Sequence, residues 1–193
     1  DVYKRQHDGT SINLIKIGNF YMTVIGVIPS RYYSSRFPGK PLENILGKSM
    51  IQRVYEQAIK SKLDKVVVAT DDHRIFNEVL SFKGEVVMTS SDHISGTERC
   101  LEAINKINSK HEIIINIQGD EPFINPSQIN QLIDSFNDKK IEITTLAKVI
   151  ISEEIFFDPN KIKVTIKNKK AVSFDRIITV SYTHLTLPTN IGV

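Results

Sequence analysis

The chain has 193 residues, of which 40% are hydrophobic, and its 25 basic and 22 acidic residues give a formal net charge of +3. This is enough apolar material for one substantial core, and the mixing of the charges along the chain argues against a nucleic-acid partner. Because the sequence has no apolar run of about 18 residues and no signal-peptide-like start, we expect a cytoplasmic protein without a membrane partner.

The first predicted strand, 23–28, is an apolar β-branched run that leads into a basic loop at 28–42. The loop reads Ile-Pro-Ser-Arg-Tyr-Tyr-Ser-Ser-Arg-Phe-Pro-Gly-Lys-Pro-Leu and carries three fixed cations within ten residues, Arg31, Arg36 and Lys40. Its small and turn-forming residues allow backbone donors and cationic groups to converge on a polyphosphate. The simpler interpretation is a connecting loop with solvated cations. We favour the phosphate site because a second strand also ends in unusual polar residues.

The next predicted elements alternate between helix and strand. Residues 50–60 place apolar side chains at helical spacing, and 65–70 form the unbroken apolar run typical of a strand buried on both faces. A helix at 74–82 and a short strand at 85–88 follow. We expect the pair Asp71 and Asp72 to end the strand at 65–70 and to cap the helix that follows it.

A polar loop, 89–95, precedes the next predicted helix. Ser95 or Thr97 suits the N-cap of this helix and Glu98 suits its first turn, which accounts for the local sequence without any ligand. Arg99 is harder to explain in this way, because helix starts favour acidic residues. We therefore interpret Arg99 as a ligand-binding residue.

Cys100 is the only cysteine, which excludes internal disulfides and a cysteine-rich metal site. It begins the same helix, in which Leu101, Ile104 and Ile107 supply apolar side chains. We expect it to be a buried apolar residue and not a nucleophile.

The predicted strand at 112–117 delivers Gln118, Gly119, Asp120 and Glu121 to its carboxyl end. We expect Asp120 to bind Mg²⁺, because a carboxylate at a strand end that faces phosphates is a common way of sharing this ion between protein and nucleotide. The alternative is a turn or capping aspartate. Glu121 is either a second metal ligand or a solvated neighbour. Two polar strand ends at one edge of a sheet together predict a site.

After a helix that begins near Pro126, the last predicted strands are 141–149 and 161–166. The whole pattern indicates a three-layer α/β/α sandwich with a mostly parallel, Rossmann-like sheet. We expect one domain at 21–180, incomplete at its carboxyl end. Segments 1–6 and 181–190 resemble translated adapter sequence, so we expect 1–20 to be a non-native or disordered leader and 181–193 a non-native tail.

Several catalytic patterns are missing from the sequence. No pair of histidines has the spacing of a helical zinc site, and Gly-x-Ser-x-Gly, the Walker sequence and Gly-x-Gly-x-x-Gly do not occur. These absences argue against a zinc enzyme, a serine hydrolase, a P-loop ATPase and a classical dinucleotide dehydrogenase.

Four motifs in this order resemble the 3-deoxy-manno-octulosonate cytidylyltransferases, also called CMP-Kdo synthetases. They are the basic loop at 28–42, Val-Val-Val-Ala-Thr-Asp-Asp at 66–72, Ser-Gly-Thr-Glu-Arg at 95–99 and Asn-Ile-Gln-Gly-Asp-Glu-Pro at 116–122. The resemblance extends from about residue 23 to about residue 178. It implies a nucleotide-diphospho-sugar transferase fold and transfer of CMP from CTP to Kdo, for lipopolysaccharide biosynthesis, with Mg²⁺ as cofactor.

The resemblance also implies roles for individual residues. Arg31, Arg36 and Lys40 would hold the triphosphate of CTP, with Lys40 nearest the leaving pyrophosphate, and Asp120 would bind the catalytic Mg²⁺. We therefore predict Arg31, Lys40 and Asp120 as catalytic. The residues expected around the cytosine and ribose are Asp72, Ser95, Arg99 and Gln118, and Gln118 would also approach the acceptor sugar.

The sequence departs from the family pattern in two places. It reads Ser-Phe-Asp-Arg at 173–176 where the family has an aromatic-Phe-Ser-Arg segment. Family members also continue into a segment that supplies a second metal-binding aspartate and much of the acceptor sugar pocket and of the interface of the expected homodimer. The alternatives are therefore a relative that uses 8-amino-Kdo or sialic acid, or a CTP-binding fragment without activity. A nucleic-acid-binding module is disfavoured by the scattered charge.

Overall fold

The computed structural model describes residues 2–7, 10–15, 22–34, 37–168 and 170–177. The chain divides into two compact units, Asp1–Thr144 and Thr145–Val193. Among the described residues, no helix has both the length and the apolar character that crossing a bilayer requires. The expected domain limits remain a prediction, and 178–193 lies outside the described residues.

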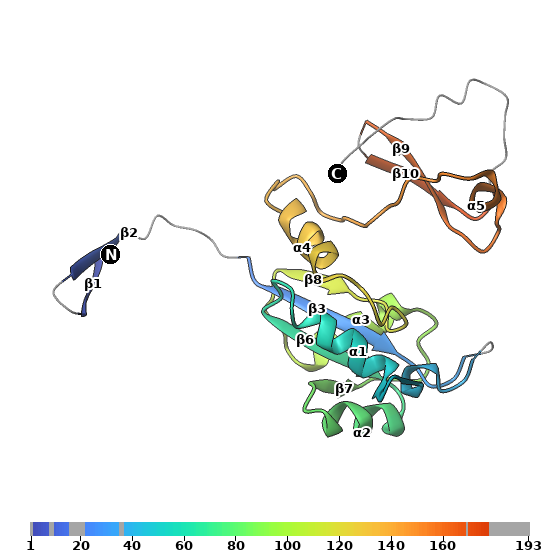
Figure 1. The fold of residues 1–193 in the computed structure, drawn as a ribbon, viewed down its shortest axis with the longest axis horizontal. Coiled ribbons are helices and arrows are strands. Elements are labelled where there is room, and N and C mark those ends of the chain that lie inside the picture. Colours follow the sequence, from blue (N-terminus) through green and yellow to red (C-terminus); the bar gives the residue numbers. More distant parts are fainter. Residues whose placement is uncertain (1, 8–9, 16–21, 35–36, 169, 178–193) are drawn as a thin grey trace. The chain divides into compact units, whose positions relative to one another are not determined.

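The centre of the first unit is a four-stranded sheet in which every pairing is parallel (Figure 1). Its strands are β3 (Val24–Ser30), β6 (Lys65–Thr70), β7 (Val86–Met88) and β8 (Ile113–Asn116), in the order β7-β6-β3-β8. The predicted strand at 65–70 has the observed limits, and the other three differ from prediction by one or two residues at an end. Apolar β-branched runs suit strands that are covered on both faces.

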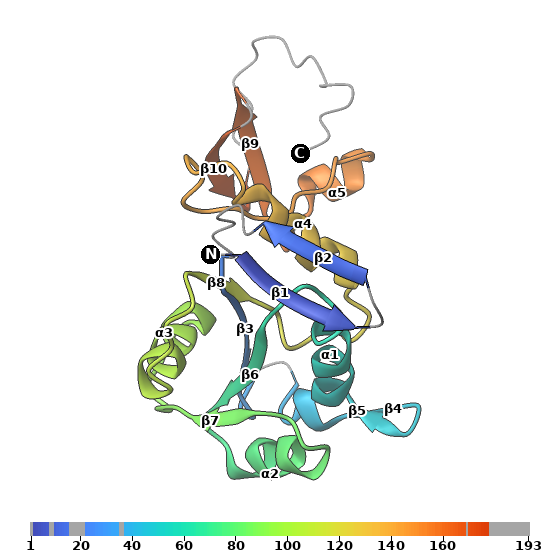
Figure 2. The same cartoon turned by 90° about the vertical axis from the view of Figure 1, so that its left-hand side faces the viewer.

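Helices cover both faces of this sheet (Figure 2). On one face pack α1 (Met50–Ala58), α2 (His73–Ser81) and α4 (Pro126–Ser135), through a buried cluster that includes Ile51, Ile75 and Ile129. The opposite face is covered by α3 (Gly96–Lys106), through Cys100, Ala103 and Ile104. The predicted three-layer α/β/α sandwich is therefore confirmed, and so is the burial of Cys100.

Each of these helices begins at a polar cap. The side chains of Ser49, Asp72, Ser95 and Asn125 each accept a hydrogen bond from a backbone N–H in the first turn of α1, α2, α3 and α4 respectively. Such caps satisfy donors that the helix itself leaves free. The expected cap at Ser95 and the expected helix start at Pro126 are confirmed.

Short elements complete the first unit. The 3-10 helix η1 (Lys40–Leu42) forms the end of the basic loop, and β4 (Asn44–Ile45) pairs with β5 (Lys48–Ser49) before α1. Nearer the amino terminus, β1 (Val2–His7) pairs in antiparallel fashion with β2 (Thr10–Ile15).

The second unit contains α5 (Glu153–Phe157) and an antiparallel pair, β9 (Lys163–Lys167) with β10 (Lys170–Asp175). β9 corresponds to the predicted strand at 161–166.

The predicted strand at 141–149 is wrong, because these residues form no strand. Their β-branched residues favour an extended chain, but the preference needs a partner strand, and none of the described strands pairs with this segment.

Candidate functional site

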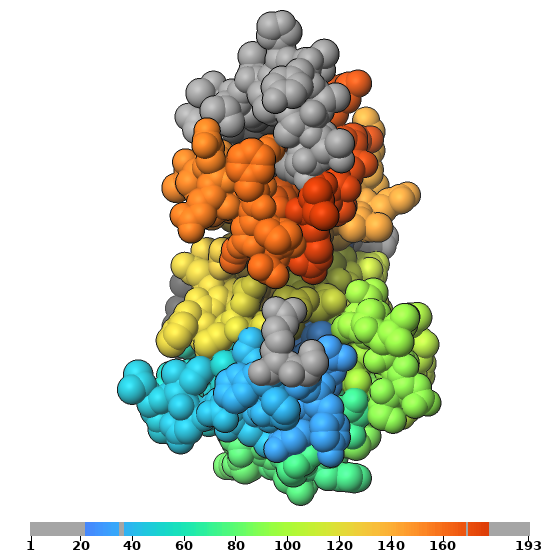
Figure 3. Space-filling model, turned by 90° about the vertical axis from the view of Figure 1, so that its right-hand side faces the viewer, coloured from blue at the N-terminus to red at the C-terminus, as the bar shows by residue number. Residues whose placement is uncertain are grey.

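The carboxyl edge of the sheet brings together two segments that are about 90 residues apart in sequence. β3 pairs with β6 on one side and with β8 on the other, so the chain leaves β3 and β8 from neighbouring positions. Figure 3 faces this edge, with the basic loop in blue next to the yellow segment that follows β8. Ligands of open α/β sheets bind where the strand order reverses in this way.

Tyr32 and Gly39 close the basic loop at its base. The N–H of Gly39 donates to the carbonyl oxygen of Tyr32 at 2.8 Å. Gly39 has a φ of 76°, which L-residues rarely adopt, and a Cβ on it would lie 3.2 Å from the Tyr32 ring. The turn at Gly39 then directs Lys40 into η1.

The three predicted phosphate-binding cations occupy different surroundings. Lys40 is half-buried, and its Nζ donates to Oδ2 of Asp120 at 2.8 Å. Arg31 is exposed at the end of β3, with no ion pair among the described residues. Arg36 lies outside the described residues.

A close packing of backbones sets the position of Asp120. The preceding Gly119 lies against the end of β3, since a Cβ on Gly119 would stand 3.0 Å from the carbonyl oxygen of Pro29. Only a glycine allows this approach without a shift. Asp120 therefore stands directly beside the basic loop, with about half of its side chain exposed.

The metal-binding capacity of this edge is modest. Within the described parts of the chain, no group of three His, Cys, Asp or Glu side chains could hold a metal ion. Mg²⁺, however, commonly takes one or two carboxylates together with phosphate and water oxygens. The exposed carboxylate of Asp120 fits such a shared site as one ligand. Glu121 is also exposed, and it has no ion pair among the described residues.

Asp72 is already engaged by Arg74. Its carboxylate accepts hydrogen bonds from the backbone N–H of Arg74 and from the Nε and Nη2 of the same residue, at 2.9, 2.9 and 2.7 Å. The guanidinium of Arg74 lowers the pKa of Asp72 from its usual range. Neither Arg74 nor Tyr32, whose ring lies 3.2 Å from the Arg74 Cζ, was expected as a site residue from the sequence.

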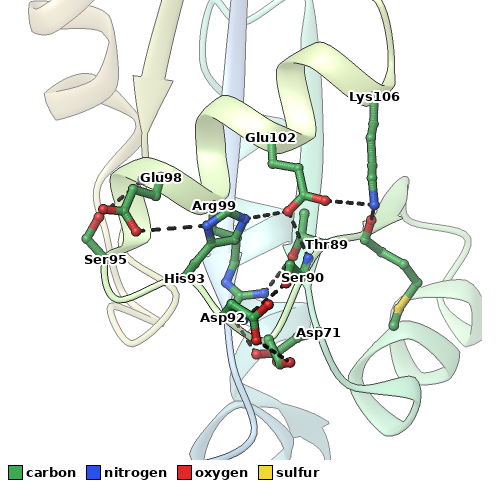
Figure 4. A network of polar contacts seen from close by, with 12 residues as sticks. Asp71, Thr89, Ser90, Asp92, His93, Ser95, Glu98, Arg99, Glu102 and Lys106 are labelled. Carbon is green, nitrogen blue, oxygen red and sulfur yellow. Dashed lines mark hydrogen bonds and ion pairs between the residues drawn. The ribbon is translucent and has the colours of Figure 1, made fainter.

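Arg99 is buried and forms bonds inside the protein. Only 3% of the residue is exposed, and its guanidinium donates to Oγ1 of Thr89 at 2.6 Å and to Oδ2 of Asp71 at 2.7 Å (Figure 4). These bonds join the start of α3 to the ends of β6 and β7. The unusual arginine in a first helical turn therefore has a structural partner, Asp71.

The loop before α3 is anchored by a second set of contacts that sequence analysis missed (Figure 4). The carboxylate of Glu102 accepts from the Ser90 N–H at 2.8 Å and from Lys106 Nζ at 2.8 Å, and it also contacts the His93 ring. Lys106, Ser90 and His93 together lower the pKa of Glu102 to about 2. Only the i, i+4 spacing of Glu102 and Lys106 is a signal that the sequence offers.

Comparison with known proteins identifies the family of this chain. The sequence model of the cytidylyltransferases matches residues 25–186, which is most of the chain. The chain belongs to the cytidylyltransferase family.

Similar proteins carry a more specific name. A 3-deoxy-manno-octulosonate cytidylyltransferase from Parabacteroides distasonis is 54% identical over 162 residues, which are 81% of this chain and 64% of that protein. One from Cytophaga hutchinsonii is 49% identical over 157 residues, 80% of this chain and 62% of that protein. The chain therefore spans just under two thirds of the length of these relatives.

A solved structure supports the same relationship. A CMP:2-keto-3-deoxy-manno-octonic acid synthetase, complexed with CTP, superimposes with a TM-score of 0.76 at 41% identity, covering 80% of this chain and 64% of that one. The resemblance that the four motifs indicated is thus confirmed, as is the fold.

The predicted site residues that the structure describes form two groups. Lys40, Asp120, Gln118 and Arg31 lie at the ends of β3 and β8 or in the segments that follow. Gln118 is exposed there, and its Nε2 donates to Oδ1 of Asn116 at 3.3 Å. The other predicted residues, Asp72, Ser95 and Arg99, stand at the starts of α2 and α3 and are used in caps or ion pairs.

Proposed function

We propose that the chain is the nucleotide-binding part of a 3-deoxy-manno-octulosonate cytidylyltransferase, which transfers CMP from CTP to Kdo and releases pyrophosphate. The observation that carries this proposal is the pairing of Lys40 with Asp120 at the carboxyl edge of the sheet. A cation and a metal-binding carboxylate at one strand-order reversal suit a nucleoside triphosphate. The names of the relatives and the CTP complex of the similar structure support the same substrates.

The reaction needs positioning and charge neutralisation more than a nucleophilic side chain. A hydroxyl oxygen of the sugar forms a bond to the α-phosphorus of CTP, the bond between that phosphorus and the bridging oxygen breaks, and the hydroxyl proton passes to solvent. Charge increases on the leaving pyrophosphate. Lys40, Arg31 and Arg36 neutralise that charge and hold the phosphates in line.

We assign Asp120 as the protein ligand of Mg²⁺. A bound divalent cation supplies charge stabilisation for the phosphates. Asp120 would hold the ion as one ligand, and phosphate and water oxygens would supply the others. In this structure the Asp120 carboxylate is paired with Lys40 at 2.8 Å, and both groups can exchange this partner for the metal ion and a phosphate.

The nucleoside is proposed to lie toward α2 and α3. Gln118 and Ser95 are exposed, and the Gln118 side-chain carbonyl oxygen and the Ser95 hydroxyl proton suit the ribose, the cytosine or the acceptor, while the Ser95 oxygen caps α3. Asp72 and Arg99 contribute to the same region, and their ion pairs imply that much of their effect is to order the loops that contact the ligand.

The remaining expectations belong to the same proposal. Kdo is the acceptor, the complete protein is a homodimer, and the product serves lipopolysaccharide biosynthesis in the cytoplasm. A related acid sugar, 8-amino-Kdo or sialic acid, is the alternative acceptor. Because the chain spans under two thirds of its relatives, binding of CTP without turnover is the second candidate function.

The test is pyrophosphate release from CTP, Mg²⁺ and Kdo. It is measured on this chain and on the same chain extended with the carboxyl-terminal segment of the Parabacteroides distasonis relative. Release that depends on Kdo in the extended protein supports the proposal. Release with sialic acid in place of Kdo identifies the alternative acceptor. If the extended protein folds but releases no pyrophosphate with either sugar, the proposed function is contradicted.

A further inference from the structure

The side chain of Arg74 lies on the basic loop, although it belongs to α2. Its Cζ is 3.2 Å from the centre of the Tyr32 ring and 5.9 Å from that of Tyr33. The two rings themselves pack edge to face, with centres 5.4 Å apart. A guanidinium over an aromatic face is attracted by the ring and stacks on it.

Arg74 is itself fixed in place. Its Nε and Nη2 donate to the two carboxylate oxygens of Asp72, at 2.9 and 2.7 Å, in the two-pronged geometry that suits arginine. Asp72 is held in turn, because its carboxylate caps α2 and its N–H donates to Oγ1 of Thr70 at the end of β6. The guanidinium is therefore attached to the rigid edge of the sheet.

Tyr32 connects Arg74 to the part of the basic loop that carries Lys40. Its ring packs against the core cluster under α1 and α2, and its carbonyl oxygen accepts the N–H of Gly39 at 2.8 Å. A Cβ on Gly39 would be 3.2 Å from the same ring, so the ring and the Gly39 turn are in close contact. Lys40 follows directly.

We propose that Arg74 is a positioning residue for the nucleotide: it clamps Tyr32 through its stacked guanidinium and so fixes the Gly39 turn that presents Lys40 to the phosphates. This inference rests on the proposed function for its ligand. The clamp explains why Asp72 is ion-paired and not free, since its carboxylate orients Arg74. A surface ion pair alone contributes little to stability. The Arg74–Asp72 pair instead orders the basic loop before the ligand binds, and this lowers the entropic cost of binding.

The test compares three variants in two measurements, hydrogen exchange of the Gly39 amide without nucleotide and calorimetric binding of CTP with Mg²⁺. Arg74→Ala removes the clamp, and Arg74→Lys keeps the charge but loses the planar stack and the two-pronged pair. Arg53→Ala is the matched control, because Arg53 holds another loop through the carbonyl oxygens of Ile45 and Leu46.

We expect Arg74→Ala and Arg74→Lys each to speed exchange at Gly39 about tenfold and to weaken CTP binding about tenfold, the size of a partly desolvated cation–π contact. Arg53→Ala should match the wild type in both measurements. Full binding by Arg74→Lys would overturn the proposal, because it would show that the charge acts directly on the ligand. Unchanged exchange in Arg74→Ala, or faster exchange with unchanged CTP affinity, would overturn it as well.

The two measurements separate this inference from the proposed function. If the wild-type chain binds no CTP, the proposed function is overturned for this chain. The exchange rates of Arg74→Ala against Arg53→Ala, measured without nucleotide, then still show whether Arg74 holds the loop.

Discussion

Lys40 and Asp120 are 80 positions apart in sequence, yet the lysine Nζ lies 2.8 Å from the aspartate Oδ2. Both side chains are partly exposed, by 36% and 54%. An ion pair of this kind adds little to stability, because water already solvates its charges well. Its position in the segments that follow β3 and β8 instead makes both groups available to exchange partners with a nucleotide and its metal ion.

Lys40→Ala should weaken CTP binding while it leaves the fold intact. Loss of one cation from a half-buried phosphate site costs about 2 kcal/mol, which is about a 30-fold rise in the dissociation constant. The melting temperature should barely change. Lys62→Ala is the matched control, since Lys62 forms a similar surface pair with Asp134 at 2.9 Å. If Lys40→Ala unfolds the protein in proportion to its loss of binding, the assignment of Lys40 fails.

Asp120→Asn should have opposite effects with and without metal. In Mg²⁺ the variant lacks a charged ligand and should bind CTP more weakly. In EDTA it lacks a negative charge that repels the triphosphate, so it should bind CTP at least as well as the wild type. Calorimetry in the two buffers gives both values. Glu112→Gln, at the amino end of β8, should change neither, and equal weakening in both buffers by Asp120→Asn would rule out a metal-ligand role.

The Arg99–Asp71 pair should be a stabilising contact that is costly to break. The side chains are 4% and 15% exposed, and removal of one partner from a buried pair typically costs about 3–5 kcal/mol. We expect Arg99→Met and Asp71→Asn to lower the free energy of unfolding in urea by this order. Lys65→Met breaks an exposed pair with Glu85 and should cost less than about 1 kcal/mol. A stable Arg99→Met variant that no longer binds CTP would show instead that Arg99 is chiefly a ligand-binding residue.

Glu102 should make stability depend on pH under acidic conditions. Bonds from Lys106, Ser90 and His93 lower its pKa in the folded state from 4.5 to about 2. A carboxyl group with a lowered folded-state pKa adds stability above its unfolded-state pKa, and this is lost as the pH falls toward the folded-state value. The difference in unfolding free energy between wild type and Glu102→Gln should therefore be largest above pH 4.5 and shrink as the pH falls toward 2. A difference that stays constant over this range would contradict the prediction.

The sequence predicted the layers well because their signals are local. The apolar run at 65–70 and the periodic apolar residues of α1 each identify their element without reference to other parts of the chain. The segment at 141–149 was mistaken for a strand because strand formation depends on a partner that a single sequence does not reveal. β10 was missed for the same reason, since it exists only as the partner of β9.

The sequence also predicted that two polar segments lie at one edge of the sheet, whereas the roles of their residues stay predictions. A parallel sheet places the carboxyl ends of its strands at one edge, so motifs after β3 and β8 had to lie on the same side of the molecule. The direct contact of Lys40 with Asp120 needed the further fact that β3 and β8 are neighbours. Contacts such as Arg74 on Tyr32 or Arg99 on Asp71 join residues about 30 or more positions apart and leave no local pattern.

Hydrogen exchange of the chain with and without CTP and Mg²⁺ tests most directly whether the carboxyl edge of the sheet is the nucleotide site. We predict that CTP slows exchange at 31–42 of the basic loop and in the segment at 118–121, and leaves α4 and the β4–β5 hairpin unchanged. Saturable protection at another place, or none at these two segments under conditions where the protein is folded, would contradict the account.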